Sequence, residues 1–231
     1  MSQKLRIVVE AVPHGPWSGL AGHIEAAGAE VLAVSGDEGP IEFPAGWIPD
    51  GLVTVPAQHQ RARFDQIDLD RWDTAAQEEL DRRFHIAQAV ARRMLEGDGG
   101  SLVHLVAAEG LPGLAGAGSA ASLSYAVAGL SRGIALDLRD RVRSNVIVAE
   151  PDAAGLVAAV TLALHLCGAQ GRGVSGQIAA IDAENLRLFS QSRPVRIAHR
   201  DGGWDEASLA AQIGRWASCL PRLEDMEGVT Q

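Results

Sequence analysis

A phenol and an amine that could transfer a proton together each occur once in this chain. The phenol is Tyr125 and the amine is Lys4, far apart in the sequence. Acid–base catalysis by such a pair needs both groups at one site, and on a helix the partner of Tyr125 would stand about one turn away. Gly129 occupies that position. The two residues therefore do not form a catalytic pair at helical spacing.

Three other polar residues fall near the end of one predicted strand. They are His104, Glu109 and Ser119, which could in principle supply a substitute acid–base set. A strand-end histidine and two polar loop residues explain the same pattern without any chemistry. Both interpretations stay open at the level of the sequence.

The composition excludes several classes of function. The 231 residues are 47% hydrophobic, and a net charge of −9 with scattered arginines disfavours nucleic-acid binding. The longest apolar stretch, Leu156–Cys167, contains His165 and is too short to cross a bilayer, and the N-terminus has no signal-peptide pattern. Cys167 and Cys219 lack metal-binding spacing, so we predict no metal site, no membrane contact and a cytoplasmic location.

Apolar runs alternate with segments of helical periodicity, which is typical of βαβ units around a parallel sheet. The predicted strands are Leu5–Val9, Glu30–Val34, Gly51–Val55, Ser101–Val106, Ser144–Ala149 and Gln177–Ile181. The predicted helices are Ser18–Ala27, Asp68–Glu96, Ser119–Asp140 and Asp152–Cys167. The order predicts a Rossmann-like, doubly wound α/β fold.

Three segments together resemble a known enzyme family. Gly100–Glu150 is similar to the catalytic half of a short-chain dehydrogenase/reductase, Ser175–Asp182 to its last strand, and Arg71–Leu95 to its first long helix. The resemblance covers about 180 of the 231 residues and depends on the order and spacing of elements. It implies a truncated version of that family's fold, with residues 1–185 as one domain and 186–231 as a C-terminal extension.

The resemblance also implies that the catalytic groups are missing. The family uses a serine, a tyrosine, a lysine and an asparagine, and these positions fall on Ala107, Ala120, Ser124 and Glu79. Alanine has no proton to transfer and serine carries no charge. This set therefore lacks the family's proton-transfer machinery.

The family's phosphate-binding turn is degenerate as well. It aligns with Glu10–Trp17, where Ala11 and Trp17 replace glycines and Gly15 alone survives. Pro16 lacks an amide donor, and the Trp17 indole would block close approach of a pyrophosphate or simply plug an empty crevice. We therefore expect no cofactor on this chain.

Two family segments are shortened or absent. The connection between the second and third strands is too short for the elements that frame the adenosine, and Pro151 leads directly from a strand into a helix where the substrate lid belongs. Losing the lid removes a means of excluding water.

The resemblance implies a non-catalytic subunit, a pseudoenzyme whose paralogous partner carries NAD and the catalytic residues, in a heterotetramer. The chain resembles the inactive subunit of the heteromeric hydroxyacyl-CoA dehydrogenase of anaerobic toluene degradation. The family's assembly helix corresponds to the small-residue segment Ala117–Gly133, and the arginine-rich stretch Leu186–Trp204 would contact a partner, a CoA phosphate or solvent. The alternatives are an autonomous reductase with relocated residues and a small-ligand sensor.

Overall fold

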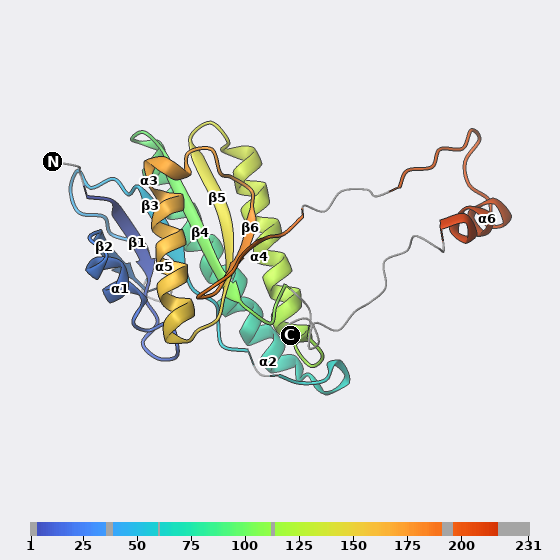
Figure 1. Cartoon of the computed structure of the whole chain (residues 1–231), viewed down its shortest axis with the longest axis horizontal. Coiled ribbons are helices and arrows are strands. Elements are labelled where there is room, and N and C mark those ends of the chain that lie inside the picture. The colour runs from blue at the N-terminus through green and yellow to red at the C-terminus, as the bar shows by residue number, and fades with distance from the viewer. Residues whose placement is uncertain (1–3, 36–38, 60, 112–113, 191–195, 217–231) are drawn as a thin grey trace. The chain divides into compact units, whose positions relative to one another are not determined.

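The computed structural model describes residues 4–35, 39–59, 61–111, 114–190 and 196–216. The chain divides into two compact units between Phe189 and Ser190. The first unit is built on one seven-stranded sheet in the order β2-β1-β3-β4-β5-β6-β7 (Figure 1). The second unit contains one described helix, α6 (Glu206–Trp216).

All strands of the sheet are parallel except the last. Their bounds are β1 Arg6–Glu10, β2 Glu30–Val34, β3 Gly51–Thr54, β4 Gly100–Ala107, β5 Val142–Ala149, β6 Ile178–Ile181 and β7 Leu186–Leu188. β7 pairs antiparallel with β6 at the edge. The central strands β3, β4 and β5 are buried on both faces, which explains why they read as continuous apolar runs in the sequence.

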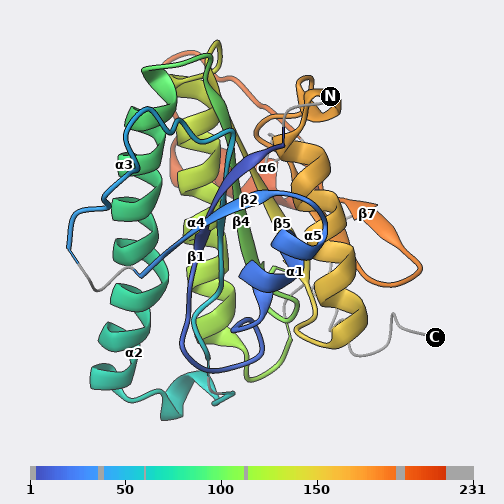
Figure 2. The same ribbon diagram turned by 90° about the vertical axis from the view of Figure 1, so that its left-hand side faces the viewer.

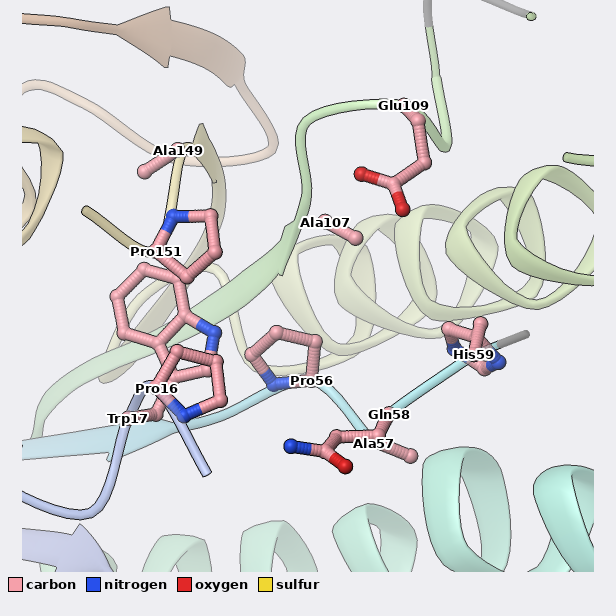
Figure 3. A pocket seen from close by; sticks show the side chains of 10 residues that line it. All are labelled: Pro16, Trp17, Pro56, Ala57, Gln58, His59, Ala107, Glu109, Ala149 and Pro151. Carbon is pink, nitrogen blue, oxygen red and sulfur yellow. The ribbon is translucent and has the colours of Figure 1, made fainter. Parts of the chain in front are cut away.

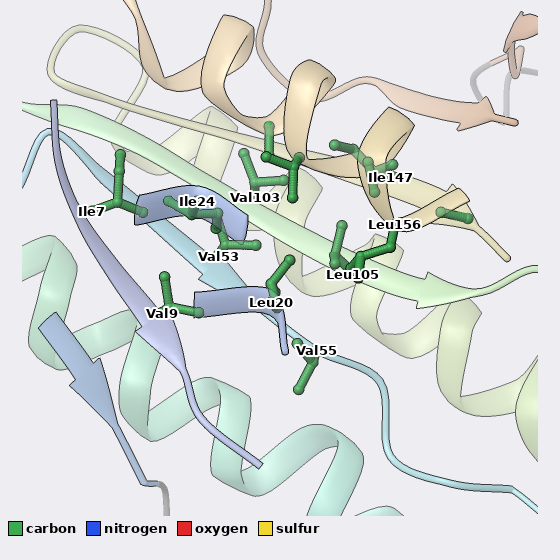
Figure 4. Close-up of a cluster of buried hydrophobic side chains, with 14 of the residues drawn as sticks. Ile7, Val9, Leu20, Ile24, Val53, Val55, Val103, Leu105, Ile147 and Leu156 are labelled. Carbon is green, nitrogen blue, oxygen red and sulfur yellow. The ribbon is translucent and has the colours of Figure 1, made fainter. Parts of the chain in front are cut away.

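Helices cover both faces of the sheet, as Figure 2 shows. Their bounds are α1 Leu20–Ala26, α2 Leu69–Ala76, α3 Arg82–Leu95, α4 Gly118–Asp137 and α5 Ala153–Cys167. On the α1 and α5 face, Leu20, Ile24 and Leu156 join one core cluster with side chains of the central strands (Figure 4). On the opposite face, α3 contributes Ile86 and Val90 to a second cluster. The predicted doubly wound α/β fold is confirmed.

The region predicted as one helix, Asp68–Glu96, differs in detail. A π-helical turn, Gln77–Asp81, separates α2 from α3. The predicted cap is correct, because the Asp68 carboxylate accepts a hydrogen bond from the Arg71 amide. Periodicity near 3.6 residues per turn continues through a single wide turn, so the sequence does not reveal it.

Two elements were missed by the sequence prediction, β7 and α6. All three β7 residues are exposed, and α6 buries none of its residues. β7 has only three residues, too few to show a period. α6 does carry Leu209, Ile213 and Trp216 at helical spacing, and the sequence prediction did not use this signal.

Both shortened connections lie where the sequence predicts them. No helix or strand occurs in the described part of the β2–β3 connection, which packs through buried Trp47; its indole N–H donates to Glu30 at 2.6 Å. Dinucleotide-binding sheets have the strand order 3-2-1-4-5-6, with a third strand beyond the second. In the described residues of this chain, no strand lies beyond β2. Three residues separate β5 from α5, with Asp152 capping the helix.

Candidate functional site

The candidate site lies at the carboxyl ends of the strands, beside the point where strand order reverses. β1 and β3 are neighbours there, and ligands of open α/β sheets bind at such switch points. A pocket of about 210 Å³ opens at this edge (Figure 3). Its lining residues are Pro16, Trp17, Pro56, Ala57, Gln58, His59, Ala107, Glu109, Ala149 and Pro151.

The turn after β1 is filled by the chain's own tryptophan. Trp17 is 5% exposed and belongs to the same apolar cluster as Val55 and Leu156. Figure 3 shows its indole beside Pro16 and Pro151, on one side of the pocket. This burial agrees with the interpretation of Trp17 as a plug for the crevice.

Gly15 retains a backbone function in this turn. Its φ of +95° lies in the left-handed region, and a Cβ there would come within 2.5 Å of the Gln58 amide nitrogen. The turn thus keeps a glycine for its own geometry. The following helix, α1, begins only at Leu20 and has seven residues.

Glu10 ends β1 as a fully buried carboxylate. It accepts a hydrogen bond from the Val55 amide at 2.8 Å and pairs with Nε of Arg82 at 2.5 Å. Burial raises the pKa of Glu10 above its usual value, against the opposing charges of Arg83 and Arg82. These contacts join β1, the end of β3 and α3 directly across the switch point.

Glu79, at the family's asparagine position, is the centre of a second buried cluster. Its carboxylate accepts from the Ala57 amide at 2.5 Å and pairs with Arg83 Nη2 at 2.9 Å, with His59 Nε2 at 3.6 Å. Arg83 also donates to the Leu105 carbonyl at 2.7 Å. Burial would raise the pKa of Glu79, but Arg83, His59 and the Ala57 amide together lower it. Glu79 therefore anchors the segment after β3 to the helix.

Four members of these clusters were not predicted from the sequence: Glu10 as an ion-pair residue, His59, Arg82 and Arg83. One signal was available, because Glu79 and Arg83 stand four residues apart on a predicted helix. Such pairs usually lie on a solvent-exposed face. Burial of this pair is set by the tertiary packing of α3 against the sheet.

The three remaining family positions separate in space. Ala107 ends β4 and lines the pocket. Ala120 and Ser124 lie buried on α4 and do not line it. The Ser124 hydroxyl faces Gly110, where a Cβ would come within 2.1 Å of its oxygen. Ser124 is thus part of the packing between α4 and the loop after β4.

The substitute acid–base set does not assemble. His104 is fully buried, its Nδ1 lies 3.0 Å from the Thr54 hydroxyl, and burial together with Arg83 lowers its pKa to about 3. Ser119 is half-buried near the start of α4, and only Glu109 of the three lines the pocket. Tyr125 is 58% exposed and donates to the Leu111 carbonyl at 3.2 Å. Tyr125 therefore lies outside the pocket and is hydrogen-bonded to the loop that follows β4.

Two features are absent from the part of the chain that the structure describes. No group of three or more histidine, cysteine, aspartate or glutamate side chains in this part is arranged to hold a metal ion. None of the described helices is long and apolar enough to span a membrane.

No protein-family model and no curated protein matches the sequence. Solved structures do match. A short-chain dehydrogenase from Mycobacterium avium aligns with a TM-score of 0.79 and 16% identity, over 96% of this chain and 98% of that one. The fold is that of the short-chain dehydrogenases.

Two further structures support this assignment. An oxidoreductase of the short-chain dehydrogenase/reductase family from Burkholderia thailandensis gives a TM-score of 0.67 at 16% identity, over 79% of this chain and 92% of that one. A gluconate 5-dehydrogenase from Burkholderia cenocepacia, solved with NADP and tartrate, gives a TM-score of 0.62 at 18% identity, over 78% of this chain and 94% of that one. At these identities the likeness shows the fold, and these short-chain dehydrogenase neighbours are oxidoreductases.

Proposed function

We propose that this chain is a non-catalytic subunit of a hetero-oligomeric, NAD-dependent short-chain dehydrogenase. A paralogous partner would carry NAD and the intact catalytic residues. The observation that carries the proposal is that the chain's own side chains fill the cofactor crevice: Trp17 packs in the first turn, and Glu10 and Arg82 pair across the switch point.

The residues of the first turn do not fit a dinucleotide. A pyrophosphate needs backbone amides at a helix N-terminus and close approach of the backbone. Here Pro16 has no amide to donate, the Trp17 side chain is buried in the crevice, and the short α1 begins three residues later at Leu20. The buried carboxyl group of Glu10 accepts from the Val55 amide and pairs with Arg82, so it offers no donor to a phosphate.

The substrate side supports the same proposal. Ala107 offers no hydroxyl at the pocket, and the three-residue connection between β5 and α5 leaves no room for a lid. Without a lid the site stays open to water, which weakens electrostatic catalysis. Turnover on this chain alone would need groups that the pocket does not present.

The exposed face of α4 is suited to assembly with the partner. Gly129 and Gly133 have nothing within 4 Å of where a Cβ would stand, and Tyr125 and Leu136 are each 58% exposed nearby in sequence. Small residues beside exposed apolar ones permit close helix–helix approach. We propose a heterotetramer in the cytoplasm that acts on a hydroxyacyl-CoA through the active subunit, as in anaerobic toluene degradation.

The test is co-expression with a short-chain dehydrogenase paralogue that has a complete cofactor turn and catalytic set. We expect the two chains to co-purify, and the complex but not this chain to oxidise hydroxyacyl-CoA thioesters with NAD. Isothermal calorimetry should detect no NAD(H) binding to the isolated chain. Micromolar affinity for NAD(H), or turnover by this chain alone, contradicts the proposal.

The alternative of an autonomous reductase is less well supported. It needs an accessible histidine or tyrosine, but His104 is buried and neutral, and Tyr125 lies outside the pocket. Its test is loss of reductase activity on His104→Gln or Tyr125→Phe substitution. The alternative of a ligand-binding protein is favoured by one observation, the pocket itself.

A further inference from the structure

One residue that lines the pocket has a buried polar atom without a hydrogen-bond partner. His59 has a side-chain exposure of 4%, lines the pocket, and its Nδ1 makes no hydrogen bond within the described structure. Unpaired buried polar atoms are rare because each costs free energy. In Figure 3 the His59 ring lies at the edge of the pocket, on the side opposite Trp17.

The neighbour of His59 decides what this atom can bind. Nε2 faces the Glu79 carboxylate at 3.6 Å, and the lowered pKa of Glu79 keeps that carboxylate ionised. In the neutral imidazole the ring proton therefore lies on Nε2, and Nδ1 is left as a hydrogen-bond acceptor. A ligand must bring the donor.

The second polar group is also an acceptor. Glu109 lines the pocket, and Figure 3 shows its carboxylate pointing from the end of β4 toward Ala107. The electrostatic potential around Glu109 is negative, as its effect on neighbouring Glu150 indicates. Burial raises the pKa of Glu150, the charges of Glu109 and Asp152 raise it further, and Arg61 lowers it. This potential favours a cation over an anion.

Gln58 is the third polar side chain of the lining, and its amide can donate or accept a hydrogen bond. The other walls are mostly apolar and set the size of the ligand. Pro16, Trp17, Pro56 and Pro151 face the same space, and the indole can attract a cation by its π-face. A dry cavity of roughly 150 Å³ accommodates benzene. A pocket of about 210 Å³ therefore holds one ring with a short chain and is far too small for a dinucleotide or CoA.

We propose that this pocket binds a small organic ammonium ion with an apolar body about the size of one aromatic ring. The ammonium group donates to Glu109 and to His59 Nδ1, and the body packs against Trp17 and the prolines. The site goes beyond the non-catalytic role proposed above. It is independent of NAD binding and of the partner, so either proposal can fail without the other.

The test uses the full-length protein at neutral pH and three probes of one shape: 2-phenylethylamine, 2-phenylethanol and phenylacetate. We expect calorimetry to give sub-millimolar binding of the amine, with the alcohol weaker by about tenfold or more, since a charged hydrogen bond is lost. Phenylacetate should not bind. Binding of all three with equal affinity, or no amine binding at millimolar concentration, overturns the proposal.

Variants locate the site. Glu109→Gln should weaken the amine about tenfold or more and leave the alcohol unchanged, while Glu25→Gln, at an exposed position on α1, should change neither. Glu109 is half-buried and has no hydrogen bond or ion pair to lose among the described contacts, so its variant should fold. Unchanged amine affinity in Glu109→Gln contradicts the assignment. 1-Methylnicotinamide is a further probe, a cation without an ammonium group; if it binds tighter than the amine, the pocket is a residual nicotinamide site and the proposal is wrong.

Discussion

His104 shows how a residue that suggests chemistry in the sequence can be structural in the fold. It stands on the central strand β4, is fully buried, and contacts the Thr54 hydroxyl on β3. Its pKa is lowered to about 3, first by burial and then by Arg83. A histidine that stays neutral in this way cannot act as a general acid near neutral pH.

This histidine should make the protein less stable in mild acid. Below its ordinary pKa of 6.5 the unfolded chain takes up a proton at His104, whereas the folded chain stays neutral down to about pH 3. Stability is therefore complete above pH 6.5 and falls by about 1.4 kcal/mol per pH unit below it. Urea unfolding between roughly pH 7 and 5 measures this slope.

The variant His104→Gln should have a shallower slope than the wild-type protein, whatever its stability at neutral pH. His85→Gln, at an exposed position on α3, is the matched control and should keep the wild-type slope. Equal slopes in all three proteins would show that His104 does not remain neutral in the folded state.

At the scale of elements, the helical region from α2 to α3 is the main connection between the two ends of the site. The π turn carries Glu79, and the first turn of α3 carries Arg82 and Arg83. Their contacts reach Glu10 at the end of β1, Ala57 after β3 and the Leu105 carbonyl of β4. Two carboxylates and two guanidinium groups balance, so none of these charges is left buried without an opposite one.

Removing one member of this cluster should destabilise the protein strongly. Arg83→Met leaves the Glu79 carboxylate without its closest cation in a fully buried position, at an expected cost of roughly 3–5 kcal/mol. The double variant Glu79→Gln/Arg83→Met should lose less than the sum of the two single variants, since the uncompensated charge is gone. Urea unfolding provides the measurement.

Arg92→Met serves as the control, because Arg92 is exposed on the same helix and its loss should change the free energy of unfolding by no more than about 0.5 kcal/mol. Additive losses in the double variant would mean that Glu79 and Arg83 do not interact energetically.

At the scale of the whole molecule, the core lies within the first unit. The buried apolar side chains of the three clusters all fall within residues 7–180, whereas α6 in the second unit buries none of its residues. β7 closes the sheet at its edge immediately before the division between the units. The first unit therefore contains what it needs to fold.

A chain that ends at Phe189 should unfold cooperatively. We expect its free energy of unfolding to lie within about 1 kcal/mol of the full-length value, because the three core clusters consist of residues that the shortened chain retains. Circular dichroism during urea titration measures it, with the full-length protein as reference. A molten or aggregated product would show that residues 190–231 contribute to the fold. If the extension contacts the partner subunit, the shortened chain should also lose co-purification with it.

The order of the elements was predictable from the sequence alone. Apolar runs and helical periodicity place six strands and the main helices within a few residues of their observed bounds, because the central strands are apolar throughout and the helices are apolar on the side that faces the core. The two shortened connections were predictable as well, because the number of residues between two predicted elements is too small to hold the missing strand or lid. β7 and the π turn were not predictable in this way, because β7 has only three residues and a single π turn leaves the apolar period nearly unchanged.

The interior of the site was decided by the tertiary structure. Glu10, His59, Glu79, Arg82 and Arg83 come from three separate stretches of sequence, and their charges matter because the fold buries them together. The sequence determines which catalytic groups are absent at the family's positions, because residue identity is enough to exclude a proton donor. What occupies the crevice instead depends on which side chains the packing excludes from water, and burial is a property of the folded chain.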